Sequence, residues 1–338
     1  MKSEPFISIV LICYNYAHLL PKALEGIAAQ TFTDFEVVFV DNGCTDNSVE
    51  VLKAFMKENP AIPVNIVTIE KNIGLANGDN TGAYAAEGKY LLFHDADDWM
   101  DPDALEKLAE AAKKTDADRV IGTYRSVNDS GKTVHEQMIA KDPIQWGYTM
   151  QQANLFKNSI YKEHSIRIKD SLWVDAEKTL RFAHYAKKVA YVDTPCWNYL
   201  VHLDSTSKNK KIHEKMWTPE YSLETLLRNV KDEYADADRT ELQLLEYGFM
   251  FVYYSYMFQF LRNAPLKEKY AGTDKLRAMM SKYFPDYLSN PYIKKKNGKS
   301  FKAKLVVRVC CAAEKMGLMK AVMLLYHIMS KFYYFQAN

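Results

Sequence analysis

The sequence predicts an α/β fold with a mostly parallel central sheet, followed by an α-helical C-terminal region. Strand-like apolar runs alternate with helix-like segments through the first part of the chain, which is the pattern of a doubly wound sheet. Beyond about residue 211, helical periodicity continues without intervening strands. Because 338 residues exceed what one core usually supports, we expect a domain over residues 1–210 and a helical region over residues 211–338.

The first part consists of repeated strand and helix patterns. The run at residues 6–13 is rich in Ile and Val, as in a parallel strand that is covered on both faces. Three more strands are predicted by similar runs at residues 35–40, 64–69 and 90–93. Apolar or small residues at helical spacing, with the caps Asp46-Asn47-Ser48 before the second segment, predict helices at residues 16–30, 49–57 and 75–87.

The elements after the fourth strand are less regular. Asp101-Pro102 has the form of an N-cap followed by a first-turn proline, which predicts a helix through about Lys114. The polar stretch 129–141 is typical of a loop beside a site. We expect further strands at residues 119–124 and 189–192, and helices at residues 180–188, 223–230, 241–262 and 305–334.

The composition excludes several classes of protein. The 44 basic and 42 acidic side chains nearly cancel, so binding to nucleic acid or to polyanions in general is not expected. Five scattered cysteines without a CxxC pair indicate reduced thiols rather than disulfides or a zinc site. The apolar run near the N-terminus is too short to span a membrane and lacks a cleavage pattern, so we expect a cytoplasmic protein.

Polar side chains follow the ends of three predicted strands; they are Tyr14, Asn15, Asp41, Asn42, Asp95, Asp97 and Asp98. In doubly wound sheets, ligands bind at the carboxyl ends of the strands, near the point where strand order reverses. Carboxylates that crowd together there raise one another's pKa unless a cation binds between them. Asp95 and Asp97 would project to one side and Asp98 away from it, which predicts a Mg²⁺ or Mn²⁺ site. Capping of the next helix is the alternative role of these acids.

Four segments carry these polar residues: Ile7-Ser-Ile-Val-Leu-Ile-Cys-Tyr-Asn15 with Gln30-Thr31-Phe32, Val40-Asp-Asn-Gly-Cys-Thr-Asp-Asn-Ser48, Asn72-Ile-Gly-Leu75 through Asn80-Thr-Gly82, and Gly88-Lys-Tyr-Leu-Leu-Phe-His-Asp-Ala-Asp-Asp98. In this order they resemble the motifs of family 2 glycosyltransferases, and the resemblance covers about residues 5–208. It implies the GT-A fold, a nucleotide-diphosphate sugar donor and inversion at the anomeric carbon.

The resemblance implies a nucleotide-binding half over about residues 1–100 and an acceptor-binding half over residues 101–210. Tyr14 matches the aromatic residue that packs against the base, and Asp41 matches the acid that binds uracil. Asp95-Ala96-Asp97 matches the DxD motif, whose first acid lies near the ribose and whose second ligates the metal. The matches imply a UDP-sugar donor with Mn²⁺ or Mg²⁺. From the residues alone, a core aromatic and a turn cap remain alternatives for Tyr14 and Asp41.

The general base of the family is a later acid, usually the Asp of a Glu-Asp pair, which deprotonates the acceptor hydroxyl. The segment Ala186-Lys-Lys-Val189 resembles the one that follows this helix in the family, which puts Asp175 at the base position and Val174 in place of the Glu. Glu177 is the alternative base. Either acid also fits the first turn of a helix, where negative charge is favourable.

The chain departs from the family pattern at three further positions. Cys13 stands in place of Thr or Ser, Asn42 in place of Asp, and Asp79 in place of Arg. The Arg would normally help to neutralise or position the nucleotide. Its loss implies that Lys71 or another basic residue substitutes for it, or that the donor differs.

Two residues near the end of the predicted domain resemble the His or basic residue that reaches the diphosphate in the family, namely His202 and Lys208. His202 is therefore a candidate metal ligand beside Asp95 and Asp97. A solvated loop is the alternative for this segment.

Basic residues precede the last predicted helix; they are Lys294, Lys295, Lys296, Lys299, Lys302 and Lys304. The helix at residues 305–334 is apolar over much of its circumference, yet it is too charged to span a bilayer. Such a helix suits peripheral binding at the inner face of the cell membrane, next to a lipid-linked acceptor. Packing on neighbouring helices, or on a second subunit of a homo-oligomer, is the alternative.

The sequence thus predicts an inverting hexosyl or N-acetylhexosaminyl transferase that uses a UDP-sugar and a glycan or lipid-linked glycan acceptor in cell-surface polysaccharide synthesis. Asn42, Asp79 and Val174 leave open a degenerate relative that binds glycans or partners without catalysis. A sugar nucleotidyltransferase would share the sheet and the acidic site, but it would want a basic, glycine-rich loop after the first strand. The segment from Tyr14 to His18 has no glycine.

Overall fold

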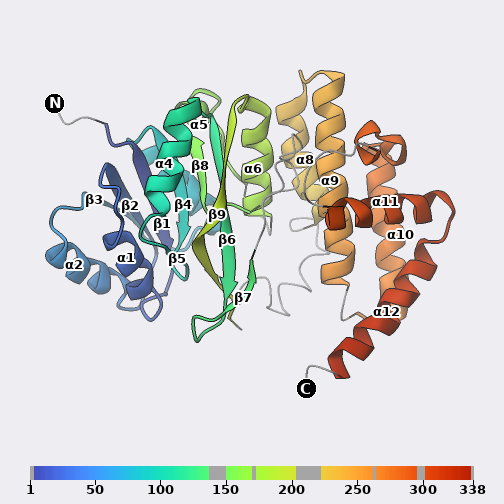
Figure 1. Cartoon of the computed structure of the whole chain (residues 1–338), viewed down its shortest axis with the longest axis horizontal. Helices are drawn as coiled ribbons and strands as arrows, with labels where there is room; N and C mark the ends of the chain where they lie inside the picture. Colours follow the sequence, from blue (N-terminus) through green and yellow to red (C-terminus); the bar gives the residue numbers. More distant parts are fainter. Residues whose placement is uncertain are drawn as a thin grey trace. The chain divides into compact units, whose positions relative to one another are not determined.

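The computed structural model describes residues 4–136, 150–169, 173–202, 222–261, 264–294 and 301–335 (Figure 1). The described residues up to His202 form one compact unit that is built on a sheet, and those from Ser222 onward form a second, helical unit. The first unit carries the residues for which the sequence predicts a role in binding or catalysis, except Lys208, which lies outside the described residues.

The sheet begins with four parallel strands. β1 (Ile7–Cys13) lies between β2 (Phe35–Asn42) and β4 (Tyr90–Asp95), and β3 (Val64–Ile69) pairs with the other side of β2. The chain moves outward from β1 to β3 and then returns to the opposite side of β1 with β4. The order of the strands therefore reverses between β1 and β4, which creates the switch point where ligands bind in such folds.

Side chains of the parallel strands alternate between two apolar cores, one on each face of the sheet. Ile9 of β1 packs in the core that includes α1 (Leu20–Ala28), α2 (Ser48–Glu58) and α4 (Ala104–Thr115). Val10 packs in the core that includes α3 (Leu75–Ala85) and α6 (Val174–Tyr185). All residues of β1 and β2 are buried, which explains their near-continuous apolar sequence.

The other half of the sheet is mixed. From β4 it continues through β8 (Asn154–Lys157), β6 (Arg119–Val127) and β9 (Val189–Leu200) to β5 (Trp99–Met100), and β7 (Thr133–Glu136) pairs with β6. β8 is antiparallel to both of its neighbours, whereas β6 and β9 are parallel. The short α5 (Asn158–Glu163) follows β8. β5, β8 and α5 are too short to give a periodic pattern, and the sequence did not predict them.

Three predicted boundaries in this half are wrong. The stretch 129–141, predicted as a loop, includes β7, which forms a hairpin with the end of β6. α6 begins at Val174 rather than at residue 180, and β9 continues past residue 192 to Leu200. The earlier start of α6 matters for the site, because it places Asp175 in the first turn of a helix.

The predicted N-cap role of Asp101 is also wrong. α4 begins at Ala104, and the side chain that accepts a backbone N–H of its first turn is Gln30, whose Oε1 accepts from Leu105 at 3.0 Å. The carboxylate of Asp101 instead accepts both terminal nitrogens of Arg125, each at 2.9 Å. Charge-assisted bidentate bonds of this kind are roughly twice as strong as neutral ones, so the guanidinium outcompetes the helix N-terminus for this carboxylate.

The second unit is helical, with α8 (Leu223–Lys231), α9 (Arg239–Phe260), α10 (Leu266–Tyr283), α11 (Phe301–Lys315) and α12 (Met319–Phe335). The single helix predicted over residues 305–334 is wrong, because the chain turns at Gly317, whose φ of 70° ends α11. Buried Glu314 of α11 accepts hydrogen bonds from the hydroxyls of Tyr253 on α9 and Tyr287. Within the described ranges, we find no helix that is long and apolar enough to cross a membrane.

Candidate active site

Three strands bring the predicted site residues to one edge of the sheet. The register pairs Cys13 of β1 with Asp41 of β2, and Ile12 of β1 with Asp95 of β4. Tyr14, Asp41 and Asp95 therefore lie at the ends of three adjacent parallel strands. This is the edge of the sheet at which the strand order reverses.

Tyr14 and Asp41 lie where β1 and β2 end, and the loops that follow these two strands are fixed to each other. Tyr14 is 41% exposed, so its ring is available for stacking and is not a core aromatic. The next residue, Asn15, has a φ of 58°, and its Oδ1 accepts the backbone N–H of Thr45 at 2.8 Å. Asp41 is buried, and its Oδ1 accepts the backbone N–H of Cys44 at 2.9 Å. Asp41 therefore does cap a turn, and this cap holds its carboxylate in place.

Asn42, which replaces a family Asp, fixes the loop that precedes α3. Its Nδ2 donates to Asn72 Oδ1 at 3.2 Å and to the carbonyl of Gly74 at 3.3 Å, and its Oδ1 accepts the N–H of Ile73 at 3.2 Å. A carboxylate could accept from Ile73 but could not donate to two oxygens. At Gly43, which has a φ of 79°, a Cβ would lie 2.6 Å from the Asn72 nitrogen. Asn rather than Asp at position 42 therefore suits the close approach of the loop after β2 to the loop before α3.

The acids that follow β4 have different partners. Asp98 is buried against β9, where its Oδ2 accepts the indole N–H of Trp197 at 2.9 Å and its Oδ1 accepts the N–H of Leu200 at 3.0 Å. Asp97 instead lies next to His202, with 3.0 Å between Oδ2 and Nε2. Because Asp98 fixes the end of β9, it also fixes the segment that carries His202 toward Asp97.

Asp95 lies beside two glutamine amides. Nε2 of Gln151 lies 3.3 Å from Asp95 Oδ1, and Nε2 of Gln152 lies 3.0 Å from Oδ2. Burial raises the pKa of Asp95 well above its usual value, and the charges of Asp175 and Asp97 raise it further. Amide donors bring no net positive charge, so a bound cation would relieve this repulsion.

Asp175 lies in the first turn of α6 and shares the electrostatic environment of Asp95. The pKa of Asp175 is raised to about 6: burial raises it most, the charge of Lys178 lowers it, and the charge of Asp79 raises it. The backbone N–H of Gln151 also lowers this pKa. A carboxyl group with a pKa this close to neutrality is suited to accept a proton during a reaction.

Glu177, the alternative base, is engaged within the fold. Its side chain is fully buried, and its Oε1 accepts the N–H of Lys169 and the Nε of Arg181, each at 3.0 Å. A carboxylate held in a buried ion pair cannot leave it at low cost. This geometry favours Asp175 over Glu177 as the group that meets an acceptor.

A buried ion pair that the sequence did not predict connects α6 with α3. Nζ of Lys178 donates to Asp79 Oδ2 at 2.6 Å and to Gln151 Oε1, and it lies 3.6 Å from the centroid of the Phe93 ring. Asp79 at the family Arg position therefore has a defined cation, whereas Lys71 is exposed. The sign of this ion pair in the sequence was an acid within a helix of small residues, because a buried acid needs a partner. The partner lies 99 residues further along the chain, and periodicity does not reveal it.

Asp97 and His202 are suitable donors for a divalent cation. Carboxylate oxygen and imidazole nitrogen are both ligands that Mn²⁺ accepts. Among the described residues, no three His, Cys, Asp or Glu side chains are arranged to hold a metal ion together. A divalent cation held by Asp97 and His202 would need water and diphosphate oxygens as its remaining ligands.

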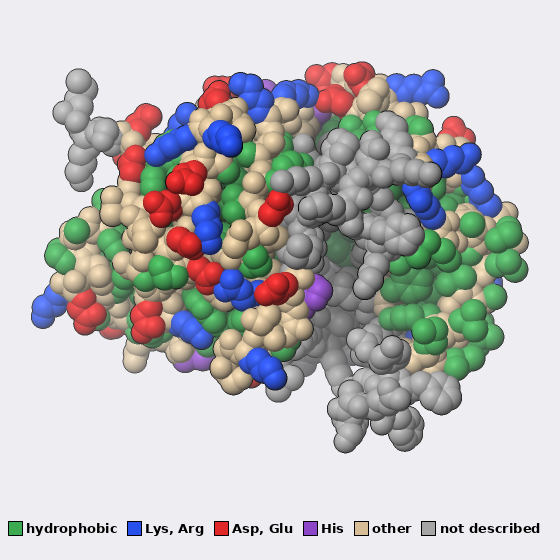
Figure 2. Space-filling view, viewed as in Figure 1, with side chains coloured by type: hydrophobic (Ala, Val, Ile, Leu, Met, Phe, Trp, Pro, Cys, Tyr) green, Lys and Arg blue, Asp and Glu red, His purple; other side chains and the backbone are tan. Residues whose placement is uncertain are grey.

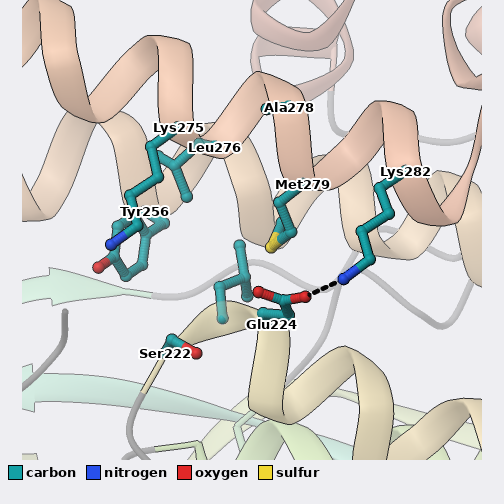
Figure 3. A pocket seen from close by; sticks show the side chains of 9 residues that line it. Ser222, Glu224, Tyr256, Lys275, Leu276, Ala278, Met279 and Lys282 are labelled. Atoms are coloured by element: carbon teal, nitrogen blue, oxygen red, sulfur yellow. Dashed lines mark hydrogen bonds and ion pairs between the residues drawn. The ribbon is translucent and has the colours of Figure 1, made fainter. Parts of the chain in front are cut away.

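A surface pocket in the helical unit contains none of the predicted site residues. It is lined by α8, α9 and α10, with Tyr256 at one end, and the ion pair between Lys282 Nζ and Glu224 Oε1 lies beside it at 2.8 Å (Figure 3). Leu276 and Met279 give the pocket an apolar wall. It has no paired carboxylates, and we assign no chemistry to it.

Comparisons with known proteins agree with the geometry of the acidic edge. Residues 8–171 match the model of the family described as glycosyl transferase family 2. Glycosyltransferase GlyG of Streptococcus pneumoniae serotype 4 is 33% identical over 136 residues, which are 40% of this chain and 44% of that protein. Poly(ribitol-phosphate) beta-glucosyltransferase of Bacillus spizizenii is 24% identical over 296 residues, which are 83% of this chain and 44% of that protein. The chain thus spans less than half the length of either relative.

A solved structure resembles the chain over nearly its whole length. The crystal structure of S. aureus TarS 1-349 in complex with UDP superposes with a TM-score of 0.62 at 17% identity, and the match covers 92% of each chain. At this identity the likeness concerns the fold alone. It confirms the prediction of a GT-A type α/β domain followed by a helical region.

Proposed function

Because this chain belongs to glycosyl transferase family 2, we propose that it is an inverting glycosyltransferase that uses a UDP-sugar as donor. The proposed acceptor is a hydroxyl of a glycan or lipid-linked glycan in cell-surface polysaccharide synthesis. One observation carries the proposal, namely the cluster of Asp95, Asp97 and Asp175 at the switch point of the sheet. We propose residues 1–100 as the nucleotide-binding half and residues 101–210 as the acceptor-binding half.

Asp175 is the proposed general base. Its carboxylate accepts the proton of the acceptor hydroxyl as the hydroxyl oxygen attacks the anomeric carbon. The new C–O bond forms on one face of the sugar while the bond to the diphosphate breaks on the other, so the configuration inverts and UDP leaves. The raised pKa of Asp175, about 6, supports this role, since the group is ionised at neutral pH and still basic enough to take the proton.

Tyr14, Asp41 and the Asp95-Ala96-Asp97 segment form the proposed donor site. The exposed ring of Tyr14 stacks on the base, and buried Asp41 binds the uracil. Asp95 lies toward the ribose. The TarS structure named above contains UDP, which supports a uridine donor for this chain by fold likeness only.

Asp97, with Asp95 or His202, would hold Mn²⁺ or Mg²⁺. A bound ion would neutralise the charge that builds up on the departing diphosphate. In this step the protein holds the Asp97 carboxylate and the His202 imidazole in place. Asp98 contributes by fixing the end of β9 next to His202.

We also propose that the helical unit contacts a membrane surface. Figure 2 shows hydrophobic side chains gathered over α11 and α12, and those that are exposed are Leu305, Val306, Val309, Met316, Leu318, Leu324, Leu325, Ile328 and Met329. Lys315 and Lys320 are exposed on the same two helices, a combination that suits an anionic leaflet. Flotation with anionic vesicles, but not with neutral ones, is the expected result. Concentration-dependent self-association without flotation would instead indicate a homo-oligomer interface.

A screen of nucleotide sugars for thermal stabilisation, with and without Mn²⁺, tests the donor assignment. We expect UDP-sugars to stabilise the protein most, and more with Mn²⁺ than without. A preference for GDP-sugars would contradict the role of Asp41. Binding without metal and without turnover would indicate a degenerate relative that only binds its ligands.

A further inference from the structure

The ion pair of Lys178 and Asp79 is sealed from solvent. The side chains of Lys178 and Asp79 are 0% and 1% exposed, and Asp79 Oδ1 has no hydrogen-bond partner among the described residues. Asn80, the next residue of α3, is fixed to Ile168 by two hydrogen bonds of 2.7 and 2.9 Å. Asp79 is therefore held on a rigid part of α3 and cannot turn to solvent.

Lys178 continues this contact toward the candidate donor site through Gln151. Its ammonium donates to Gln151 Oε1, and the amide nitrogen of the same glutamine lies within reach of both Asp95 oxygens, at 3.3 and 3.4 Å. A side-chain amide has one acceptor end and one donor end. Because Lys178 occupies the acceptor end, the donor end must face Asp95. The contacts run from Asp79 through Lys178 and Gln151 to Asp95.

Stability alone does not account for this arrangement. Burying two charges costs several kcal/mol for each ion, and replacing such a pair with apolar residues is often neutral or stabilising. The charges that act most strongly on Asp95 are those of Asp175, Asp97, Asp79 and Lys178, and only that of Lys178 is positive. A buried cation among four carboxylates therefore has an electrostatic effect on the site that an apolar side chain could not supply.

We propose that Lys178 is a positioning residue of the donor site. From α6 it supplies a buried positive charge in place of the Arg that Asp79 replaces on α3, and it orients Gln151 onto Asp95. Asp79 anchors the ammonium in this place. The inference rests on the proposed function, because it assigns Lys178 a part in the binding of the donor diphosphate and in the leaving-group step. Lys178 itself touches no reacting atom.

Three variants test the proposal, with kcat and KM for the donor and the midpoint of thermal unfolding as readouts. Lys178→Met removes the cation. Asp79→Asn with Lys178→Met removes both charges and avoids a buried, unpaired acid, so it keeps the test open where the single variant unfolds. Asp79→Lys with Lys178→Met supplies the cation from α3 instead of α6. The matched control is Arg181→Met, which removes another buried cation of α6, one that pairs with Glu177.

We expect Lys178→Met, and the neutral pair Asp79→Asn with Lys178→Met, to lose about 10- to 100-fold in kcat. This is the range found when a group that orients a metal-site ligand is removed. The variant with the cation on α3 regains most of this loss. Arg181→Met lowers the unfolding midpoint but keeps kcat within about threefold. A structural role for Lys178 would move the unfolding midpoint alone and would give no recovery when the cation is moved.

Two results would overturn the inference: a folded neutral pair with wild-type kcat, or a folded variant with the cation on α3 that is no better than the neutral pair. These results differ from a failure of the proposed function itself. In that case the wild-type protein would turn over no donor, and the inference would fall with it.

Discussion

Replacing the proposed base by an amide, Asp175→Asn, makes activity and stability change in opposite directions. The amide keeps the shape of the side chain but cannot accept the hydroxyl proton. Loss of a general base typically lowers kcat by about 10²- to 10⁴-fold, and we expect a loss in this range. The substitution also removes a carboxylate that burial and Asp79 make unfavourable in the folded state.

The size of the stability gain follows from the pKa of Asp175. Folding raises this pKa from 3.8 to about 6. A difference of about two units corresponds to roughly 3 kcal/mol, which is an upper value because neighbouring acids titrate together with this one. The folded state binds the proton more tightly than the unfolded chain, so wild-type stability falls as the pH rises from about 4 to about 6. Asp175→Asn is therefore more stable than wild type above pH 6 and gains little at pH 4.

Chemical denaturation at pH 4 and pH 8 measures this difference, and a pH profile of wild-type kcat measures the same group. We expect the wild-type rate to fall as the pH drops through about 6, because Asp175 becomes protonated there. An Asp175→Asn variant that is less stable than wild type at pH 8 would refute the electrostatic part of the reasoning. Retained transferase activity in the same variant would refute the assignment of the base.

Three further predictions follow from contacts in the same unit. Asn42→Asp loses its donors to Asn72 and Gly74 and lowers the free energy of unfolding by about 1–3 kcal/mol, as urea denaturation would show. Tyr14→Ala leaves stability within about 0.5 kcal/mol because the ring is exposed, and it weakens UDP binding in calorimetry. Glu177→Gln breaks the buried pair with Arg181 and costs about 3–5 kcal/mol of stability, whereas kcat stays near the wild-type value. Equal loss of kcat in Glu177→Gln and Asp175→Asn would leave the base unassigned to either acid.

The long parallel strands could be predicted from the sequence, because burial on both faces leaves a run of apolar residues with clear ends. The predicted strand at residues 64–69 coincides with β3, and the first helix and the first two strands differ from prediction only at their ends. Because the strand ends were clear, the candidate site residues that follow these strands could also be identified in the sequence. β5 and β8 could not be predicted in the same way, since strands of two and four residues have no periodicity to detect.

The partners of the site residues could not be predicted, because they come from distant parts of the chain. Asp79 was visible as an acid at an unexpected position, but its pairing with Lys178 depends on how α3 and α6 pack. The glutamines beside Asp95 follow a stretch without pattern, and nothing in their sequence marks them. The start of α4 was predicted wrongly because the cap-like sequence of Asp101 is overridden by its bidentate bond to Arg125.

Release of UDP during transfer from a UDP-sugar in the presence of Mn²⁺ is a direct test of the proposed glycosyltransferase activity. We predict that the wild-type protein releases UDP from at least one UDP-sugar and that Asp97→Ala abolishes this release. The variant should keep its fold, because Asp97 is partly exposed and lies at the edge of the sheet. Release of UDP at the wild-type rate by a folded Asp97→Ala protein would rule out Asp97 as the essential metal ligand, and turnover of GDP-sugars alone would rule out a UDP-sugar donor.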